Sequence, residues 1–342
     1  MEKIAIVILN WNGRKHLETF LPSVSRYSEG AAIYVADNNS TDTSIEFIKE
    51  NYPSIKLLQF TSNNGFCKGY NDALFQIEAE YYVLLNSDVE VTEHWLEPML
   101  SLMESDESIA ACQPKILDWK NREYFEYAGA AGGFVDKLGY PFCRGRIFLN
   151  LEKDLGQYND IREIFWATGA SLFVRARCYK ELGGLDEDFF AHMEEIDICW
   201  RMKLAGYKIM YCGQSTVYHV GAATLSKSSP RKTYLNFRNS LFVIYKNLPA
   251  HKLFTTILIR LILDGIAGIK FMFSDSYKHV LAILHAHYSF YKNIPTLQKK
   301  RREFGNENKK IIFSELYLGS IVFDYFIKGR VKFRAFNFKD PK

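Results

Sequence analysis

Cysteine pairs are missing from this sequence. Its six cysteines are scattered without a CxxC pair, so neither a zinc site nor a disulfide scaffold is indicated. A signal peptide is missing as well, because Glu2 and Lys3 stand directly before a short strand-like run. We therefore expect a reducing, cytoplasmic environment, in solution or on the inner face of the cell membrane.

Glycine-rich phosphate loops and long apolar runs are also missing. No GxGxxG follows the first expected strand and no GxxxxGK[ST] occurs, which argues against a dinucleotide fold and a P-loop ATPase. A membrane-spanning helix needs about 20 largely uncharged residues. The most hydrophobic segment, residues 253–273, is interrupted by Arg260, Asp264 and Lys270, so we expect no transmembrane helix.

The sequence does contain the composition of a globular protein, with an uneven distribution of charge. Apolar residues make up 48% and charged residues 24% of its 342 residues. Residues 251–342 carry 17 Lys/Arg and seven Asp/Glu, a net charge of +10, whereas residues 1–250 have a net charge of −6. Length and charge predict one large domain over residues 1–250 and a basic region over residues 251–342. The asymmetry favours a polyanionic partner, either anionic lipid or nucleic acid.

The first hundred residues alternate between strand-like and helix-like segments. This rhythm predicts a parallel sheet with helices on its faces, and Thr41 and Thr43 are expected helix caps. The expected strands are 4–9, 31–36, 55–60 and 81–85, and the expected helices are about 14–26, 42–50 and 66–77.

The rest of the predicted large domain, up to residue 250, is less regular. Residues 118–165 are polar, aromatic and rich in glycine, which predicts a long functional excursion over the sheet. Further short strands are expected at 171–174, 208–211 and 216–219, with a helix over 193–205.

Beyond Arg231 the pattern becomes mostly helical. Thr256, Arg260 and Asp264 fall on one stripe of a helix, beside a wide apolar face. That face suits either packing against the body or a second subunit, or contact with an anionic membrane surface. Basic groups at 299–302, 309–310 and 328–334 favour the membrane surface.

Short amide and carboxylate side chains follow three consecutive expected strands. Ligands bind at the carboxyl ends of the strands in open α/β sheets, so these groups predict a site for a nucleobase and ribose. The residues are Asn10, Asn12, Asp37, Asn39 and Asn64, with Asn71 in the helix that follows. The next strand ends in Asn86-Ser87-Asp88, where Asp88 would meet a charged ligand or a metal ion, or would simply make a turn.

Six acidic residues crowd into residues 186–197. On a helix, Glu194 and Asp197 share a face, while Glu195 points about 100° away. Crowded carboxylates raise one another's pKa, which helps one of them to act as a general base near neutral pH. The alternative is a solvated acidic helix start, stabilised by the helix dipole.

Five motifs occur in an order that resembles the family 2 glycosyltransferases, particularly the bacterial rhamnosyltransferases. They are DNNSTD at 37–42, NGF at 64–66, LNSD at 85–88, TGA at 168–170, and the acidic stretch from GGLDE to EEID at 183–197. The resemblance covers about residues 3–250. It implies the α/β GT-A nucleotide-diphospho-sugar transferase fold, a Rossmann-like mixed sheet flanked by helices, with a helical C-terminal extension.

The resemblance also implies roles for individual residues. Asp37 matches the carboxylate that recognises the nucleobase, and Asp88 matches the residue that holds Mg²⁺ or Mn²⁺ against the diphosphate of a UDP- or dTDP-linked sugar. Glu195 matches the general base. Other residues expected in the site are Asn10, Asn12, Asn39, Asn64, Asn71 and Ser87 beside the nucleotide, Glu194 and Asp197 beside the base, and His219, a ligand of the metal or a core residue.

Two positions depart from the family pattern. Asn86 replaces the first carboxylate of the metal-binding DxD motif, and the base is Glu rather than Asp. Hard cations tolerate the first change, because Mg²⁺ is commonly held by one or two carboxylates plus substrate phosphates.

The hypothesis is therefore an inverting glycosyltransferase that moves a sugar to a hydroxyl of a glycan or lipid-linked acceptor, in cell-surface polysaccharide synthesis. The segment 168–170 and the 118–165 excursion would line the acceptor side. Two alternatives remain: a non-catalytic sugar-nucleotide or glycan-binding module on the same fold, and a nucleic-acid-binding protein, which the basic tail suggests and the acidic body disfavours.

Overall fold

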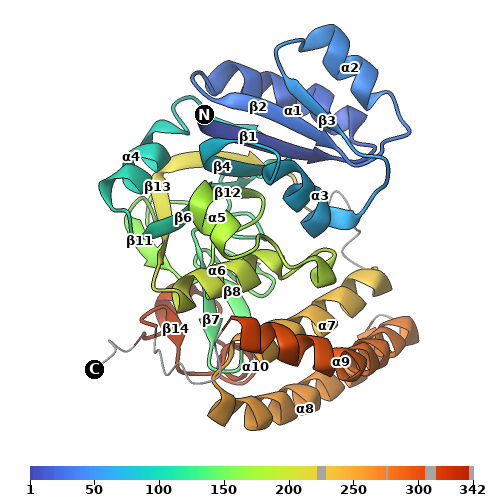
Figure 1. The fold of residues 1–342 in the computed structure, drawn as a ribbon. Helices are drawn as coiled ribbons and strands as arrows, with labels where there is room; N and C mark the ends of the chain where they lie inside the picture. The colour runs from blue at the N-terminus through green and yellow to red at the C-terminus, as the bar shows by residue number, and fades with distance from the viewer. Residues whose placement is uncertain (222–228, 275, 305–312, 339–342) are drawn as a thin grey trace.

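A large mixed sheet runs through the body of the protein. The structure is a computed structural model that describes residues 1–221, 229–274, 276–304 and 313–338. The strands of this sheet are β1 (Glu2–Asn10), β2 (Ala32–Asp37), β3 (Lys56–Gln59), β4 (Ala79–Asn86), β5 (Val89–Val91), β6 (Ile109–Asp118), β11 (Ile161–Ile164), β12 (Ser171–Arg175) and β13 (Lys208–His219). Their order is β11-β13-β6-β12-β4-β1-β2-β3, and β5 pairs with β13 (Figure 1).

The first four expected strands are parallel neighbours, as predicted. β1 pairs in parallel with both β2 and β4, and β2 pairs in parallel with β3. β12 runs antiparallel between β4 and β6, which makes the sheet mixed. The expectation of an α/β mixed sheet flanked by helices is confirmed.

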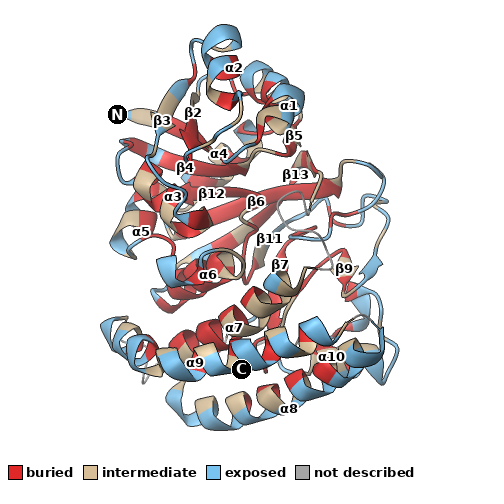
Figure 2. Ribbon diagram, turned by 90° about the vertical axis from the view of Figure 1, so that its right-hand side faces the viewer, coloured by how far each residue is buried: buried red, intermediate tan, exposed pale blue. Residues whose placement is uncertain are grey.

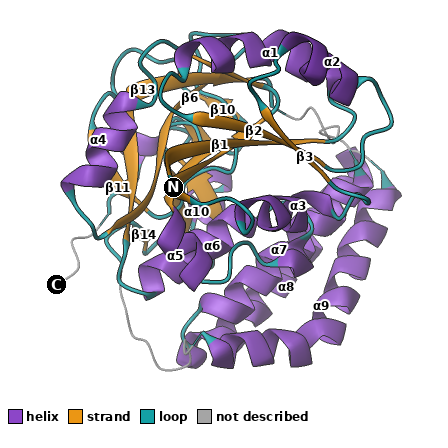
Figure 3. Ribbon diagram, turned by 45° about the horizontal axis from the view of Figure 1, so that its top comes forward, coloured by secondary structure: helices purple, strands orange, loops and turns teal. Residues whose placement is uncertain are grey.

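Helices cover both faces of this sheet. α1 (Arg14–Tyr27), α2 (Ser44–Asn51) and α4 (Glu97–Ser105) lie on one face, and α3 (Gly65–Leu74), α5 (Ala176–Glu181) and α6 (Glu194–Leu204) lie on the other (Figure 3). Alternate residues of β1 serve the two faces: Ile6 packs into the core under α1, and Val7 into the core under α3. The central strands are accordingly buried throughout (Figure 2).

Two expectations about the later strands are wrong. Residues 208–211 and 216–219 belong to the single strand β13, whose pairing with β6 shifts in register between Cys212 and Thr216. The irregular residues 212–216 interrupt the apolar pattern without ending the strand. The 118–165 excursion is also more ordered than expected: its strands β7 to β10 form a second sheet with β14 of the C-terminal region, in the order β10-β9-β8-β7-β14, and its strand β11 joins the large sheet. The strands are β7 (Gly133–Asp136), β8 (Pro141–Cys143), β9 (Arg146–Ile147), β10 (Asn150–Leu151) and β14 (Leu316–Tyr317).

The predicted helical character beyond Arg231 is confirmed. α7 (Pro230–Asn247), α8 (Ala250–Ser274) and α9 (Tyr277–Glu303) form a layer below the body in Figure 1, and the shorter α10 (Ile321–Phe326) follows. In the part of the chain that the structure describes, no helix combines the length and the apolar character needed to cross a membrane. β14 pairs with β7, so the C-terminal region returns to the body. The domain boundary after residue 250 stays a prediction.

Candidate active site

The carboxyl ends of three neighbouring strands meet at one edge of the large sheet. Asn10 of β1 is in register with Asp37 of β2, and Leu9 of β1 with Asn86 of β4. The polar turns after these strands therefore lie beside one another, as the sequence predicted for a ligand-binding edge. We call this region the donor edge.

Asp37 and Asn10 are buried at the donor edge and are held by hydrogen bonds. Asn10 Nδ2 donates to Asp37 Oδ1 (2.9 Å) and to Ser40 Oγ (3.1 Å). The backbone N–H of Ser40 donates to Asp37 Oδ2 (2.9 Å). The Asp37 residue is only 1% exposed, so its carboxylate is fixed in position by the fold itself.

Three further asparagines, Asn12, Asn39 and Asn64, lie exposed at the same edge. Asn12 Oδ1 accepts a hydrogen bond from the backbone N–H of Thr41 (2.7 Å). Asn39 has a φ of 63°, a left-handed conformation that asparagine tolerates better than most residues. Among the described residues, no side-chain hydrogen bond engages Asn39, so its amide is available to a ligand.

Asn71 lies away from the donor edge, between α3 and the segment before α6. Its Nδ2 donates to the carbonyl oxygen of Leu185 (2.8 Å), and its Oδ1 accepts from the hydroxyl of Tyr179 (2.7 Å) and from the N–H of Leu185 (2.9 Å). The side chain is buried and its hydrogen bonds are satisfied within the protein. We therefore leave Asn71 out of the proposed donor site.

Ser87 follows β4 and lies near the start of α1. A Cβ placed on Gly13 would be 3.8 Å from Ser87 Oγ and only 2.4 Å from Asn10 Oδ1. Only glycine allows the backbone to approach the donor edge so closely at this position. The arrangement keeps the space in front of Asn10 and Ser87 free of a side chain.

Asp88, His219 and Glu126 form a buried cluster beside Ser87. His219 Nε2 lies 3.1 Å from Asp88 Oδ1, and His219 Nδ1 lies 3.5 Å from Glu126 Oε2. Burial lowers the pKa of His219, but the two carboxylates outweigh this effect and raise it to about 10. The imidazolium in turn keeps the pKa of Asp88 below its ordinary value, although burial raises it. At neutral pH the cluster is an ion pair flanked by a second carboxylate.

This cluster fits a divalent cation that is shared with a substrate, but not a closed protein cage. In the described ranges, no group of three or more His, Cys, Asp or Glu side chains is arranged to hold a metal ion. Asp88 supplies a hard carboxylate oxygen, the ligand type that Mg²⁺ and Mn²⁺ prefer. His219 would have to lose its proton before it could act as a ligand, so Asp88 is the better candidate.

Two carboxylates at the start of α6 each have one oxygen without a hydrogen-bond partner among the described residues. Oε2 of Glu194 and Oε2 of Glu195 are both unpaired in the described part of the chain. Burial raises the pKa of Glu195 to about 7, and burial together with the charge of Glu195 raises that of Glu194 well above its usual value. Burial thus outweighs the helix dipole, which would favour the charged form. Glu194 is 6% exposed, whereas Glu195 is partly open to solvent, so Glu195 is the more accessible base.

Asp197 has a different environment, although it lies one turn further along α6. Its carboxylate is fully buried and accepts hydrogen bonds from Arg201 (2.8 Å), Lys246 (2.9 Å) and Asn247 (2.9 Å). Burial raises the pKa of Asp197, but Lys246 and Arg201 lower it below its ordinary value. These contacts support a structural role, and the predicted catalytic role stays a prediction.

Basic side chains of the C-terminal helices neutralise the same acidic stretch. Lys246 of α7 and Lys300 of α9 both contact Asp186, each at 2.5 Å, and Lys300 also contacts Asp188 at 2.6 Å. The expectation that the whole 299–302 group faces an anionic surface is therefore wrong: Lys300 is paired and Arg301 is buried. Burial of the acidic stretch requires counter-charges, which these helices provide. The predicted basic pair at 309–310 lies outside the described residues.

The loop before α6 is strained and is held by α7. Phe190, His192 and Met193 have φ angles of 64°, 70° and 73°, a region that costs of order 1–3 kcal/mol per non-glycine residue. Asn239 of α7 is completely buried, and its Nδ2 donates to the carbonyl oxygens of Phe189 (3.0 Å), Ala191 (2.8 Å) and His192 (2.7 Å). Asn239 therefore fixes the loop that delivers Glu194 and Glu195.

The 168–170 segment lies between the turn that bears Asp88 and the start of α6 that bears Glu195. The N–H of Asn86 donates to the carbonyl oxygen of Ala170 (3.0 Å). A Cβ on the neighbouring Gly169 would lie 3.8 Å from Glu195 Cβ and 3.7 Å from the ring of Phe66. The 168–170 segment is thus hydrogen-bonded to the end of β4 and passes next to Glu195. We call the region around Gly169 and Glu195 the acceptor edge.

Two residues of the site, Glu126 and Asn239, were not expected from the sequence. Glu126 stands between Phe125 and Tyr127, and a lone acidic residue among aromatic residues is a usable signal of a buried carboxylate. Asn239 carries no such signal, because one amide in a helical segment looks like an ordinary surface residue.

Comparison with known proteins finds glycosyltransferases among those similar to this chain. Residues 5–160 match the family described as Glycosyl transferase family 2. The chain is 25% identical over 232 residues to the N-acetylglucosaminyl-diphospho-decaprenol L-rhamnosyltransferase of Mycobacterium tuberculosis, which covers 63% of this chain and 75% of that protein.

Solved structures show the fold. The structure of GalNAc-T7 with UDP, GalNAc and Mn²⁺ superposes with a TM-score of 0.60 at 16% identity, over 90% of this chain and 55% of that chain, so our chain spans about half its length. The mannosyltransferase PcManGT of Pyrobaculum calidifontis, in complex with GDP-Man and Mn²⁺, superposes with a TM-score of 0.52 at 12% identity, over 89% of this chain and 85% of that one. The sheet, its flanking helices and the C-terminal helices follow the GT-A arrangement.

Proposed function

We propose that this chain, which belongs to glycosyltransferase family 2 and has the GT-A fold, is an inverting enzyme of glycan synthesis. Its donor would be a UDP- or dTDP-linked sugar, and its acceptor a hydroxyl of a glycan or lipid-linked saccharide. One observation carries the proposal: Glu195, which has a raised pKa and one unpaired carboxylate oxygen, lies next to Gly169, in the segment whose Ala170 is hydrogen-bonded to Asn86 at the turn that bears Asp88. A non-catalytic binding module would have no use for an unpaired buried base.

The donor edge would bind the nucleoside and its diphosphate. Asp37, held by Asn10 and Ser40, would accept a hydrogen bond from the base, and Asn39 and Asn64 would approach the ribose. Asp88 would hold the Mg²⁺ or Mn²⁺ ion. When bound, such an ion neutralises the charge that develops on the departing diphosphate.

The acceptor edge would activate the hydroxyl. Glu195 takes the proton of the acceptor hydroxyl while that oxygen forms a bond to the anomeric carbon. The bond from this carbon to the diphosphate oxygen breaks on the opposite face, so the configuration is inverted. Glu194 lies beside this base, and burial together with the charge of Glu195 raises the pKa of Glu194 well above its usual value, which favours its neutral form.

A thermal-shift screen tests the donor assignment. A nucleoside diphosphate with Mn²⁺ should raise the melting temperature, because a ligand stabilises the native state according to its affinity. We expect one nucleoside to stabilise the protein more than the others, and EDTA to remove the effect. Absence of any shift with all the nucleoside diphosphates would contradict the donor site.

The exposed apolar face of α8 and α9 supports action at a membrane surface. The stripe of Thr256, Arg260 and Asp264 is the part of α8 that is buried, and Arg260 donates to the carbonyl oxygen of Leu138 (3.1 Å). The polar stripe thus faces the body, and the apolar side chains face outward. The outward residues include Phe254, Leu258, Ile262, Ile266, Ile269, Met272, Leu281, Leu284, Tyr288 and Tyr291.

We propose that this face lies in the interface of an anionic membrane that carries the acceptor. Exposed apolar patches of this extent mark interaction sites, and a membrane-surface helix combines such a face with basic residues. Exposed Lys252, Lys270, Lys278, Lys292 and Lys299 lie on the same two helices. The acidic Asp264 of α8 is buried against His287 (3.1 Å), so it does not oppose an anionic surface.

Vesicle sedimentation separates this partner from a second copy of the chain. The double change Ile262→Ser and Ile266→Ser should lower binding to anionic vesicles by about tenfold or more, because each buried Ile contributes about 1.5–3 kcal/mol. Leu155→Ser, an exposed apolar residue elsewhere, is the matched control and should leave binding unchanged. A vesicle-free dimer that the double change dissociates would instead identify a second copy as the partner.

A further inference from the structure

A separate cavity lies where the second sheet meets the C-terminal segment. Its volume is about 560 Å³, and it is lined by residues of the excursion and of the stretch around η2 (Phe333–Ala335). Arg162 on its wall pairs in register with Tyr211, eight residues before His219 on β13. At about 3.3 Å per strand residue, the Arg162 wall of the cavity lies roughly 25 Å along β13 from His219. It is therefore distinct from the donor and acceptor edges.

Two arginines of this cavity have no carboxylate partner. Arg162 and Arg334 are exposed, and within the described residues neither forms an ion pair or a side-chain hydrogen bond. The contact found for Arg162 is with the ring of Phe134, 5.7 Å from its guanidinium carbon. Partial burial and the charge of nearby Arg144 lower the pKa of Arg162 from its ordinary value, and they outweigh the opposite effect of Asp160 and Glu315. A guanidinium in such a positive environment gains from an anion.

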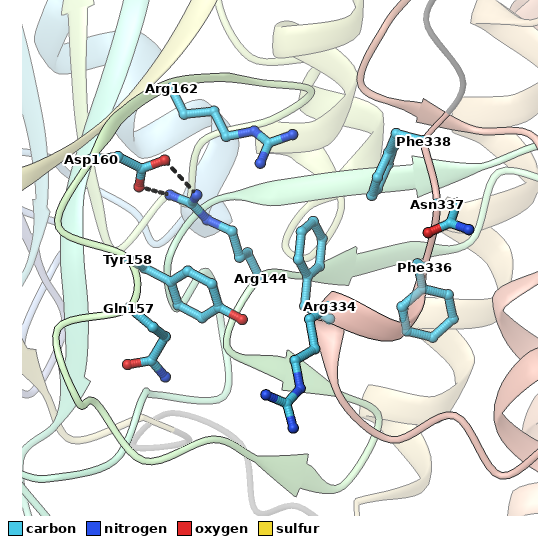
Figure 4. Close-up of a pocket in the computed structure, with 10 residues that line it drawn as sticks. Arg144, Gln157, Tyr158, Asp160, Arg162, Arg334, Phe336, Asn337 and Phe338 are labelled. Carbon is cyan, nitrogen blue, oxygen red and sulfur yellow. Dashed lines mark hydrogen bonds and ion pairs between the residues drawn. The ribbon is translucent and has the colours of Figure 1, made fainter.

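The acidic residue of the cavity is already neutralised. Asp160 accepts two hydrogen bonds from Arg144, at 2.9 and 2.8 Å (Figure 4). Arg144 is 2% exposed, and its guanidinium lies 4.7 Å from the ring centres of both Tyr158 and Tyr211. The lining groups thus leave two uncompensated positive charges. Glu152 lies behind Tyr158. Its carboxylate accepts a hydrogen bond from the Tyr158 hydroxyl (3.1 Å) and another from the N–H of Phe333 (3.0 Å).

Aromatic and amide side chains complete the lining. Figure 4 shows Tyr158 reaching into the cavity from the excursion, with Phe338 and Asn337 across from it on the C-terminal segment. A guanidinium binds carboxylate or phosphate bidentately, and aromatic rings supply apolar faces for the carbon side of a sugar ring. The volume lies in the range of small-molecule sites, about 300–1,000 Å³.

We propose that this cavity binds an anionic saccharide, with its carboxylate or phosphate facing Arg162 and Arg334 and its ring against Tyr158 and Phe338. The inference goes beyond sugar transfer, because it adds a second binding site whose ligand is neither the donor nor the reacting hydroxyl. A carboxylated or phosphorylated residue further along a growing glycan has the required chemistry.

Calorimetric titration of the full chain tests this site with four probes: glucose 6-phosphate, glucuronic acid, glucose and inorganic phosphate. We expect the two anionic sugars to bind at least tenfold more tightly than glucose, since hydrogen bonds to charged groups are the stronger ones. Glucose that binds as tightly as its phosphate would overturn the proposal. Inorganic phosphate that binds as tightly as glucose 6-phosphate would overturn its saccharide part.

Matched variants locate the site. Arg162→Gln and Arg334→Gln should each weaken glucose 6-phosphate binding by roughly tenfold, while Lys137→Gln, an exposed lysine of the same excursion, should not. Both arginines are exposed, so the variants should fold. UDP with Mn²⁺ is titrated in parallel and should bind all three variants equally. Loss of UDP binding in the arginine variants would assign the cavity to the donor and contradict a second site. Unchanged sugar-phosphate binding in them would also contradict it.

Discussion

The donor edge and the acceptor edge are built in opposite ways. At the donor edge, Asp37 and Asn10 are tied to each other and to Ser40 by short-range hydrogen bonds. At the acceptor edge, Glu194 and Glu195 each have an unpaired carboxylate oxygen, and a strained loop presents them. The Asp37 carboxylate is paired without a ligand, although Asn10 Oδ1 beside it has no partner among the described residues, whereas both acceptor-edge carboxylates keep an unpaired oxygen.

This difference shows which part of the site lowers the stability of the fold. The hydrogen bonds around Asp37 preorganise the donor edge, so this edge needs little support from other segments of the chain. Unpaired buried carboxylates and left-handed residues cost free energy, and the fold must offset it elsewhere. Here the offset comes from α7 and α9, through Asn239, Lys246 and Lys300. Breaking each edge in turn should therefore have different consequences.

The largest effect is expected from Glu195→Gln at the acceptor edge. Transfer should fall by about 10²–10⁴-fold, because a positioned base contributes that much, while the affinity for the nucleoside diphosphate stays the same. Steady-state kinetics and a binding titration measure the two quantities. Glu181→Gln, which changes an exposed acidic residue at the end of α5, serves as control. A Glu195→Gln enzyme with normal turnover would remove Glu195 from the mechanism.

The next effect is expected from Asp88→Asn at the donor edge. Donor affinity in the presence of Mn²⁺ should fall by about tenfold to a hundredfold, because the cation loses its carboxylate. The remaining affinity should no longer respond to EDTA. Asp72→Asn, which removes only a surface pair with Lys68, is the control. Equal sensitivity to EDTA in the Asp88 variant and the parent would argue against the metal role of Asp88.

A smaller effect is expected from Asn239→Ala, which removes the support of the acceptor edge. The free energy of unfolding should fall by about 1–3 kcal/mol, because buried carbonyl groups lose their donor. Turnover should fall by about tenfold as the loop loosens, with donor affinity unchanged. Asn293→Ala on α9, whose amide bonds only the carbonyl oxygen of Ser289, is the control. Loss of donor affinity equal to the loss of turnover would indicate general unfolding instead.

The last effect concerns pH, amounts to no more than about tenfold within one unit below pH 7, and sharpens the contrast between the edges. The pKa of Glu195 is raised to about 7 by burial, so the base form is present above this pH. The transfer rate should rise with pH up to about 7 and then level off, falling about tenfold per unit on the acid side. Because the pKa of Glu195 is higher in the folded protein than in the unfolded chain, its ionisation also lowers the free energy of unfolding. This loss of stability develops as pH rises from the pKa of the unfolded chain to about 7. A flat rate profile between about pH 5 and 9 would contradict the assignment.

The sequence predicted the donor edge well because its chemistry is local. Asn10, Asp37 and Asp88 each follow a buried strand directly, so strand pattern and turn residues together locate them. The acidic stretch was also visible, but its members were not separable: Asp197 is paired with Lys246 and Arg201, whereas Glu195 is unpaired. Spacing along a helix shows which residues share a face, but it does not show which residues of other segments contact that face.

Contacts between distant segments decided the rest. The apolar pattern of α8 indicated an amphipathic helix, but only the structure shows that the polar stripe faces inward, because Arg260 and Asp264 find partners in the body and on α9. Glu126, Asn239 and the Arg162–Arg334 cavity depend on segments that are far apart in the chain. Local periodicity and strand-end chemistry are thus determined by the sequence alone, since they depend on near neighbours. Charge pairing, burial and cavities depend on which distant residues meet, and only the tertiary structure decides that.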